Sequence, residues 1–384
     1  MRIKAAVARL PHMPLSVEDL NLDTRSMRAT EVLVKLVATG LCHTDLAARE
    51  QHLPITFPAI LGHEGAGIVQ AVGEAVVLVK AGDRVVLAPA HCGRCSSCRA
   101  GHPSYCLETH ALNLPGPRRD GTHPYTDTHG HAVNGGFFGQ SSFATYCLAK
   151  ESSVVRIDDD SVALDILGPL GGALQTGAGT VLNVLRPGAG DSIAVFGIGT
   201  VGLAAVMAAK AAGCTTIVAV NVNVNANANV NVNANSNDQR LALATSLGAT
   251  HTLNSRDHPV TDDIRARIHP GGVHCSIDTT GRSAVIAQAV GCLMVRGRCA
   301  LAATPSVAKL EIDGSIMNAG RSIASVQAGD SVPSLFIPKL IDLYRRGLFP
   351  FDRLISFYEL ADINQAIEDF ESGTAIKAVI RMPD

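Results

Sequence analysis

Residues 192–202, SIAVFGIGTVG, join a run of strand-like residues to a glycine-rich turn and to the start of an alanine-rich helical segment. The turn has the pattern G-x-G-x-x-G. In this pattern the first glycine makes a tight turn, the second lets the backbone approach a pyrophosphate, and the third lets helix and strand pack closely. The free N–H groups of the helix N-terminus then bind the phosphates. With a strand before it and a helix after it, the turn predicts a dinucleotide site, although a structural turn would look similar. The residues that would form the site are Gly197, Gly199, Thr200, Val201 and Gly202.

Strand-like and helix-like segments alternate after this turn. Strands are expected at 215–220, 251–254, 274–280 and 299–303, and helices at 200–213, 237–248, 261–270 and 283–294. Strands that alternate with helices of this length indicate βαβ units and a doubly wound parallel sheet. We therefore expect an α/β chain with a dinucleotide-binding Rossmann domain over residues 174–318.

A ribose-binding acid is expected about 20 residues after the glycines, at the end of the second strand. Asn221 occupies that place, and it begins the repeat NVNVNANANVNVNANSN, residues 221–237. Asparagine can hydrogen-bond a ribose, but it lacks the charge that makes such bonds stronger. No Arg or Lys lies between Lys210 and Arg240 to hold a 2′-phosphate, so the sequence favours NAD over NADP.

The overall composition limits the classes of function. The 384 residues are 47% hydrophobic and 17% charged, which favours about two or three folded domains over a disordered chain. The formal net charge of −2 gives no electrostatic reason to expect nucleic acid or an anionic membrane as partner. Ten cysteines without a recognisable signal peptide predict reduced thiols and metal ligands in a cytoplasmic enzyme.

The first part of the chain, residues 1–173, is rich in Gly, Pro and short β-like runs such as EVLVKLVATG and DRVVLAPA. Few long helical patterns occur there, so we expect an irregular, mostly antiparallel β domain. Amphipathic helical patterns return at 334–349 and 361–373, the second with Asp362 as its expected cap. Residues 319–384 are expected to return and complete the first domain.

Four cysteines fall within one short segment, at about residues 91–107. Cys92, Cys95, Cys98 and Cys106 have the spacing C-x2-C-x2-C-x7-C. Four thiolates so spaced can close a tetrahedral shell, which indicates structural zinc. An iron–sulfur run would need a shorter last spacing followed by Pro. The spacing also makes four unrelated free thiols a poor explanation.

A second group combines Cys42-His43-Thr44-Asp45 with Gly62-His63-Glu64-Gly65. Cys42 and His63 are suitable zinc ligands, and Asp45 could orient His63 through a hydrogen bond. Taken singly, a core Cys and a turn His would be the simpler interpretation. Their occurrence together with a dinucleotide site favours a catalytic metal.

Six motifs carry a resemblance that runs over essentially the whole chain. They are GLCHTDL, GHEGAGIV, the four-cysteine segment, GGFFGQSSFATY, LGPLGGALQTGAGTVLN and GIGTVG. Their order resembles that of the zinc-dependent medium-chain alcohol dehydrogenases, and most of all the aryl-alcohol (benzyl-alcohol) branch. The resemblance implies a chaperonin-10-like β catalytic domain, NAD, a structural and a catalytic zinc ion, and a homodimer or homotetramer. It also implies NAD-linked oxidation of primary aromatic or allylic alcohols to aldehydes, and the reverse.

The same resemblance implies roles for single residues. Cys42 and His63 would bind the catalytic zinc, with Glu64 beside it. Thr44 would receive the proton of the alcohol. His43 and Lys377 would face the pyrophosphate of the cofactor.

Three positions depart from the family pattern. Gly172 stands where the family has its third zinc-binding Cys, and glycine has no side chain to offer a metal. Cys42, His63 and Glu64 with one water could still hold zinc. Asn221 replaces the ribose acid and starts an insertion that its composition describes as a solvated loop, with a polar hairpin as the alternative. Ala47 stands where many relatives have a histidine that relays protons.

An NAD-linked alcohol dehydrogenase acting on a small-molecule alcohol is therefore the favoured function. The alternatives are a catalytically impaired or non-catalytic homologue, and a zinc-free NAD(P)H reductase on the same fold. The number of zinc ions per chain would separate the first function from the other two.

Overall fold

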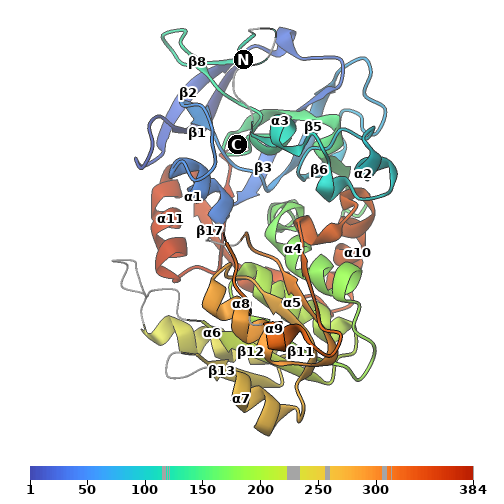
Figure 1. Cartoon of the computed structure of the whole chain (residues 1–384). Helices are drawn as coiled ribbons and strands as arrows, with labels where there is room; N and C mark the ends of the chain where they lie inside the picture. The colour runs from blue at the N-terminus through green and yellow to red at the C-terminus, as the bar shows by residue number, and fades with distance from the viewer. Residues whose placement is uncertain are drawn as a thin grey trace.

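The computed structural model describes residues 1–114, 118, 120, 122–222, 234–255, 260–304, 309–312 and 314–383. Figure 1 shows two stacked lobes, with the N-terminal strands and the chain ends in one and the helices α5 to α8 in the other. In these described ranges no helix combines the length and the apolar character needed to cross a bilayer. Residues 223–233 of the asparagine repeat, and with them the choice between loop and hairpin, lie outside the description.

The second lobe is built on a six-stranded parallel sheet with the order β13-β12-β11-β14-β15-β16. This is the 3-2-1-4-5-6 order of a Rossmann fold, so the predicted doubly wound sheet is confirmed. Its strands are β11 (Ser192–Phe196), β12 (Thr216–Asn221), β13 (His251–Asn254), β14 (Val273–Asp278), β15 (Leu293–Leu301) and β16 (Ser322–Ser325). β16 pairs parallel with β15, so the sheet extends beyond residue 318, the boundary expected from the sequence.

Helices connect these strands on both faces of the sheet (Figure 1). They are α5 (Thr200–Ala211), α6 (Ala234–Leu247), α7 (Thr261–Asp263), the π-helical turn η8 (Ile264–Ile268), α8 (Ser283–Gly291) and α9 (Gly314–Met317). α6 begins before residue 237, and the single helix expected at 261–270 is divided at Ile264. The helix expected to reach residue 294 ends at Gly291, because Leu293 already pairs with Val273 in the sheet.

The first lobe contains two sheets that are antiparallel apart from one parallel pair, β17 with β18, as expected for a chaperonin-10-like domain. One sheet has the order β4-β1-β2-β7-β8, from strands Ala59–Ile60, Arg2–Ala8, Ser16–Leu22, Tyr125–Thr126 and Ala132–Val133. The other has the order β10-β6-β5-β3-β18-β17, from Val154–Arg156, Arg84–Leu87, Gly65–Val72, Glu31–Gly40, Lys377–Arg381 and Ile355–Glu359, and β9 (Tyr146–Lys150) pairs with β3.

The helices of this lobe and of the junction are short. They are α1 (His43–Arg49), α2 (Ser96–Arg99), α3 (Thr109–Asn113), α4 (Ala173–Gly179), α10 (Pro333–Arg345) and α11 (Ile363–Ser372). α11 buries its apolar face in the core of the first lobe, and β18 enters the larger sheet, so the C-terminal residues return as expected. α10 instead packs its apolar face into a core shared with α4 and α5. Asp362 stands at the N-cap of α11, but its side chain accepts no capping hydrogen bond, contrary to the sequence prediction.

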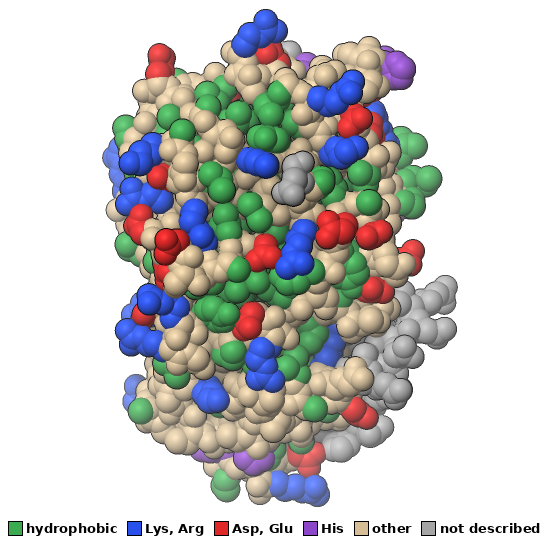
Figure 2. Space-filling model, turned by 180° about the vertical axis from the view of Figure 1, so that it is seen from behind, with side chains coloured by type: hydrophobic (Ala, Val, Ile, Leu, Met, Phe, Trp, Pro, Cys, Tyr) green, Lys and Arg blue, Asp and Glu red, His purple; other side chains and the backbone are tan. Residues whose placement is uncertain are grey.

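Charge is evenly spread over the surface drawn in Figure 2. Basic and acidic side chains are interspersed across both lobes on that face. On that face the described basic and acidic residues therefore form no continuous positive patch of the kind that marks a nucleic-acid surface.

Candidate functional site

The glycine turn lies at the carboxyl end of β11, next to the point where the strand order reverses. Gly197 has φ +93°, and a Cβ there would lie 2.3 Å from Thr279 Oγ1. Nothing lies within 4 Å of a Cβ placed on Gly199, whereas one on Gly202 would lie 1.8 Å from Gly197 O. The turn therefore leaves open space at its second glycine and close helix–strand contact at its third, as dinucleotide binding requires. Thr200 and Val201 begin α5 directly after Gly199, which carries no capping side chain.

Asn221 is the last residue of β12 and is 4% exposed. Its backbone oxygen accepts a hydrogen bond of 3.0 Å from Ser255 N, but its Nδ2 has no hydrogen-bond partner among the described residues. The sheet fixes the orientation of this buried amide donor at the end of the second strand. The donor is therefore available for a hydrogen bond to a polar group of a ligand. The structure thus leaves a buried donor of Asn221 without a partner among the described residues at the carboxyl end of β12.

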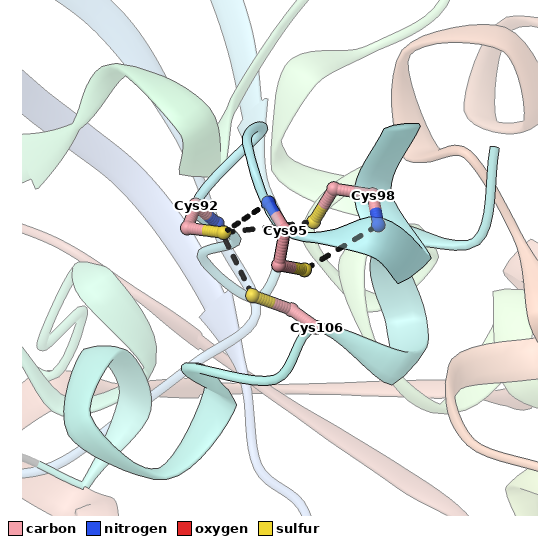
Figure 3. Close-up of side chains that lie close together, drawn as sticks. All are labelled: Cys92, Cys95, Cys98 and Cys106. Carbon is pink, nitrogen blue, oxygen red and sulfur yellow. Dashed lines mark hydrogen bonds between the residues drawn. The ribbon is translucent and has the colours of Figure 1, made fainter. Parts of the chain in front are cut away.

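The four-cysteine lobe brings its thiols together, as Figure 3 shows. The sulfur atoms of Cys92, Cys95, Cys98 and Cys106 all lie within 4.8 Å of one another. Backbone N–H groups point at the sulfurs, from Cys95 to Cys92 at 3.3 Å and from Cys98 to Cys95 at 3.5 Å. The N–H groups of Cys98 and Leu107, which both donate to the Cys95 sulfur, lower the pKa of Cys95 to about 6. Four sulfur ligands, with no further His, Cys, Asp or Glu in the group among the described residues, fit a closed tetrahedral zinc site.

The second group is organised around Asp45, which lies 1% exposed in the first turn of α1. Its carboxylate accepts hydrogen bonds of 3.0 Å from Cys42 N and from Gly62 N, and it contacts His63 Nδ1 at 2.9 Å. His63 therefore has Nδ1 engaged and Nε2 available for a metal. Burial alone would lower the pKa of His63, but the charge and hydrogen bond of Asp45 raise it well above its ordinary value.

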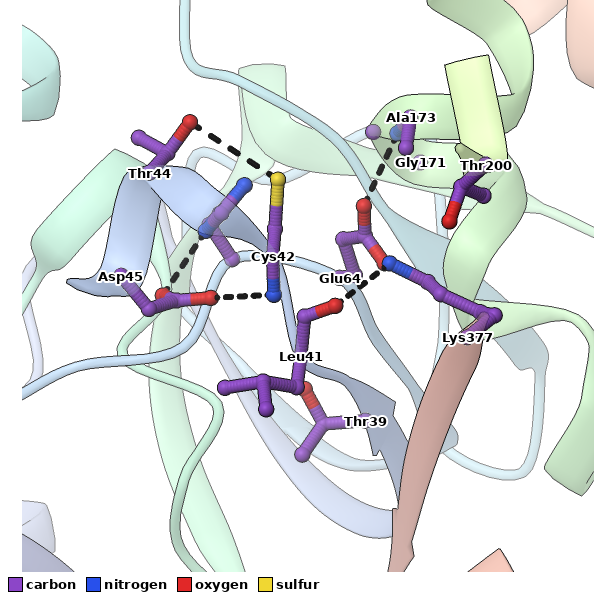
Figure 4. A network of polar contacts seen from close by, with 12 residues as sticks. Thr39, Leu41, Cys42, Thr44, Asp45, Glu64, Gly171, Ala173, Thr200 and Lys377 are labelled. Atoms are coloured by element: carbon purple, nitrogen blue, oxygen red, sulfur yellow. Dashed lines mark hydrogen bonds and ion pairs between the residues drawn. The ribbon is translucent and has the colours of Figure 1, made fainter. Parts of the chain in front are cut away.

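Glu64 completes this group from the other side of Cys42 (Figure 4). One donor atom each from Cys42, His63 and Glu64 lies within 4.8 Å of the others. The Glu64 carboxylate is fully buried, accepts a hydrogen bond of 2.8 Å from Ala173 N, and forms an ion pair with Lys377. A thiol, an imidazole and a carboxylate at this separation fit a zinc ion that keeps a fourth position open.

Gly172 and Gly40 make the space for that carboxylate. A Cβ on Gly172 would lie 2.3 Å from Glu64 Oε1, and one on Gly40 would lie 2.1 Å from Glu64 Oε2. The position expected to hold the third cysteine ligand is therefore occupied by the side chain of Glu64. This contact was not predictable from the sequence alone, because it depends on how the loop at 168–172 lies against β5.

His43 and Lys377, which the resemblance directed toward a pyrophosphate, lie close to the same group. Lys377 is 1% exposed and also donates a hydrogen bond of 2.7 Å to Leu41 O. Its neighbour Ile376 accepts a hydrogen bond of 2.7 Å from Thr200 Oγ1, which fixes β18 to the first residue of α5. His43 is exposed, but the protein around its ring desolvates it and lowers its pKa to about 4, and the nearby charges of Lys377 and Arg240 act in the same direction.

Some residues at the site were missed by the sequence analysis. Arg240 on α6 donates a hydrogen bond of 3.0 Å to Gly373 O, and its buried Nε has no partner among the described residues. Phe137 and Phe138 place their rings 5.9 Å and 4.7 Å from the ring of His63. The pair FF within GGFFGQSSFATY was the available signal for this aromatic wall. Thr44 lies on the other side of the sulfur, with its Oγ1 3.8 Å from Cys42 Sγ.

Comparison with known proteins matches both lobes. Residues 28–159 match the alcohol dehydrogenase GroES-like domain, and residues 200–344 match the zinc-binding dehydrogenase domain. The chain is 40% identical to geraniol dehydrogenase of Castellaniella defragrans, over 98% of this chain and 97% of that protein. Two crystal structures cover the full length of both chains. They are a zinc-binding-domain alcohol dehydrogenase protein of Burkholderia ambifaria (44% identity, TM-score 0.93) and benzyl alcohol dehydrogenase of Acinetobacter calcoaceticus (37%, 0.91).

Proposed function

Because the chain belongs to the zinc-dependent medium-chain alcohol dehydrogenase family, we propose that it oxidises primary aromatic or allylic alcohols to aldehydes with NAD, and catalyses the reverse reaction. The observation that carries the proposal is the Cys42–His63–Glu64 group, placed beside the α5 glycine turn. Relatives named for geraniol and for benzyl alcohol support the two substrate classes. The aromatic wall next to His63 also suits an aryl or allylic group.

We assign the catalytic metal to Cys42, His63 and Glu64, and the structural metal to the four cysteines 92, 95, 98 and 106. Zinc in the first site would supply a Lewis acid that lowers the pKa of the alcohol hydroxyl. Asp45 keeps His63 in the tautomer that presents Nε2, and the N–H of Ala173 holds the carboxylate of Glu64 toward Cys42. These contacts preserve the orientation of the ligands between turnovers.

Proton movement falls to Thr44. Its hydroxyl lies beside Cys42 Sγ, so it can accept the proton of an alcohol held at the metal position. Ala47 follows on the next turn of α1 and has no group to carry the proton onward. Release of the proton to solvent would therefore pass through water or a group supplied by the cofactor.

The cofactor would lie along the carboxyl edge of the parallel sheet. NAD would supply the nicotinamide as hydride acceptor. Gly197, Gly199, Thr200, Val201 and Gly202 would hold its pyrophosphate, with His43 on the opposite side. Lys377, which the resemblance also directs there, is buried and engaged with Glu64 and Leu41 O, so it would act on the metal ligand rather than on the pyrophosphate. Asn221 would contact the adenosine ribose, and no Arg or Lys lies between Lys210 and Arg240 to hold a 2′-phosphate. The protein would work in the cytoplasm as a homodimer or homotetramer.

The relatives do not favour the alternatives of a non-catalytic homologue or a zinc-free reductase, but Gly172 gives a reason to test them. The test measures zinc per chain and NADH formation with benzyl alcohol and geraniol, with NADP in place of NAD as a comparison. The expected result is two zinc ions in the parent and one in Cys98→Ser, with NADH formed from both alcohols. One zinc ion in the parent and no NADH would overturn the proposal.

A further inference from the structure

One of the contacts between the four-cysteine lobe and the rest of the molecule is made to a small turn, η9 (Ala328–Asp330), and to Ser331 after it. Two lobe residues that lie between the cysteine ligands make the polar contacts. His102 Nδ1 lies 3.0 Å from Asp330 Oδ1, and Ser104 Oγ donates a hydrogen bond of 3.0 Å to Ser331 O. The backbone that carries the metal ligands therefore also fixes the position of Ser331.

On its other side η9 is pressed against α4. A Cβ on Gly329 would lie 2.2 Å from Gln175 O, and a Cβ on Gly179 would lie 2.3 Å from Gly329 O. The amide of Asn183 adds a hydrogen bond of 3.0 Å to Gly329 O. At such backbone contact, a shift of η9 cannot be absorbed by side chains and is passed to α4.

A buried polar pair connects this contact to the metal-binding group. Ser331 Oγ donates a hydrogen bond of 2.7 Å to Gln175 Oε1, and Gln175 Nε2 donates to Gly171 O. Both side chains are at most 1% exposed. Gly171 immediately precedes Gly172 and Ala173, whose N–H holds Glu64 Oε1. The path from the lobe to Glu64 is thus continuous through residues 104, 331, 175, 171 and 173.

We propose that Gln175 and Ser331 are positioning residues that couple the four-cysteine lobe to the carboxylate of Glu64. The inference rests on the proposed catalytic metal site, because Glu64 is its third ligand there. A carboxylate in a site without the third cysteine must be held by its surroundings, and the N-terminus of α4 is what holds it. Gln175 fixes that N-terminus through the Gly171 carbonyl, and the lobe fixes Gln175 through Ser331.

The test compares two buried polar side chains on the same helical segment. Gln175→Met keeps the approximate volume and removes both hydrogen bonds of the path. Thr180→Val is the matched control, because Thr180 is fully buried and its Oγ1 donates a hydrogen bond of 2.7 Å to Thr176 O rather than to a residue of the path. Ser104→Ala removes one of the two polar contacts between the lobe and this segment without touching a cysteine, and it is expected to raise exchange at Ala173 less than Gln175→Met does, because the contact of His102 with Asp330 remains. Ser331→Ala replaces Gln175→Met if the latter does not fold.

Two measurements are made on the full chain with the lobe metal bound. Hydrogen exchange follows the Ala173 amide on the peptide spanning residues 171–176. Titration with Co²⁺ gives the affinity of the second site, and the charge-transfer band of the Cys42 thiolate reports its geometry. Gln175→Met is expected to exchange faster at Ala173 and to weaken Co²⁺ binding by about 10–100-fold, the effect typical of partners that orient metal ligands. Thr180→Val is expected to lower the melting temperature without changing either quantity.

Equal exchange and equal Co²⁺ affinity in Gln175→Met and the parent would overturn the inference, as would the same changes in Thr180→Val. A parent that binds no second Co²⁺ would contradict the proposed metal site. In that case the exchange rate of Ala173 alone decides whether Gln175 and Ser331 position the α4 N-terminus, so the two failures are distinguishable.

Discussion

Gly172 leaves room for the carboxylate of Glu64, so this single residue decides which side chain serves as the third ligand. In Gly172→Cys the new Cβ would lie 2.3 Å from Oε1 and 2.7 Å from Cγ of Glu64, so the thiol can take the position only if it displaces the carboxylate from the N–H of Ala173. We expect this variant to keep its second zinc through dialysis and to oxidise benzyl alcohol at least ~10-fold faster than the parent.

Gly172→Ala is the matched control for this prediction, because it fills the same space without a thiol. It should displace Glu64 and lose the second zinc, as measured by metal analysis after dialysis. Equal zinc retention and equal rates in the parent and Gly172→Cys would instead mean that Glu64 already completes the shell as well as a thiolate does.

Asn221 is the second residue at which a single substitution tests the proposed function. Its Nδ2 is buried without a partner among the described residues, and an Asp would replace that donor with a charged acceptor for ribose hydroxyls. A charge-assisted hydrogen bond exceeds a neutral one by about 1–2 kcal/mol, or roughly five- to thirty-fold in affinity. Asn221→Asp is expected to tighten NAD by that factor in calorimetry and to give no gain with NADP. Unchanged NAD affinity would show that residue 221 does not touch the ribose.

At the scale of elements, one ion pair attaches the segment after α3 to the start of β3. Arg118 contacts both carboxylate oxygens of Glu31 at 2.8 and 2.7 Å and donates 2.9 Å to Ser26 O. Glu31 is 7% exposed, and its carboxylate also accepts a hydrogen bond of 2.9 Å from Arg28 N. Arg118→Met should lower the free energy of unfolding by about 3–5 kcal/mol, because it leaves a buried carboxylate unpaired. Urea denaturation measures this free energy of unfolding. Adding Glu31→Gln to Arg118→Met should recover much of the lost stability.

The elements also show what the sequence could and could not predict. The alternation of strands and helices predicted the parallel sheet. Its strands are buried on both faces, so they appear in the sequence as long apolar runs. The spacing of the cysteines predicted the structural metal site, because all four ligands belong to one local segment. The Glu64–Lys377 pair and the Ser331–Gln175 pair join residues far apart in the chain. Only tertiary packing brings the members of each pair together, so no local sequence pattern could predict these contacts.

At the scale of the whole molecule, the C-terminal strand holds the first lobe together. β18 lies between β3 and β17, and Ala378, Val379 and Ile380 are fully buried. A chain that ends at Gly373 should lose the cooperative thermal unfolding of this lobe, because β3 and β17 lose their shared partner. Circular dichroism during heating measures this. A chain that ends at Met382 keeps β18 and the hydrogen bond of Met382 N to Val37 O, and should melt like the parent.

The same strand gives the molecule a mechanical property. Ile376 is tied to the first residue of α5, and Lys377, one step along the same rigid strand, is tied to Glu64. Lys377 and Glu64 both belong to the first lobe, so a rotation of the second lobe would act first on the hydrogen bond between Thr200 and Ile376. That bond lies one residue from Lys377, so a displacement of β18 there would reach the Glu64 carboxylate, at the place where the metal would sit.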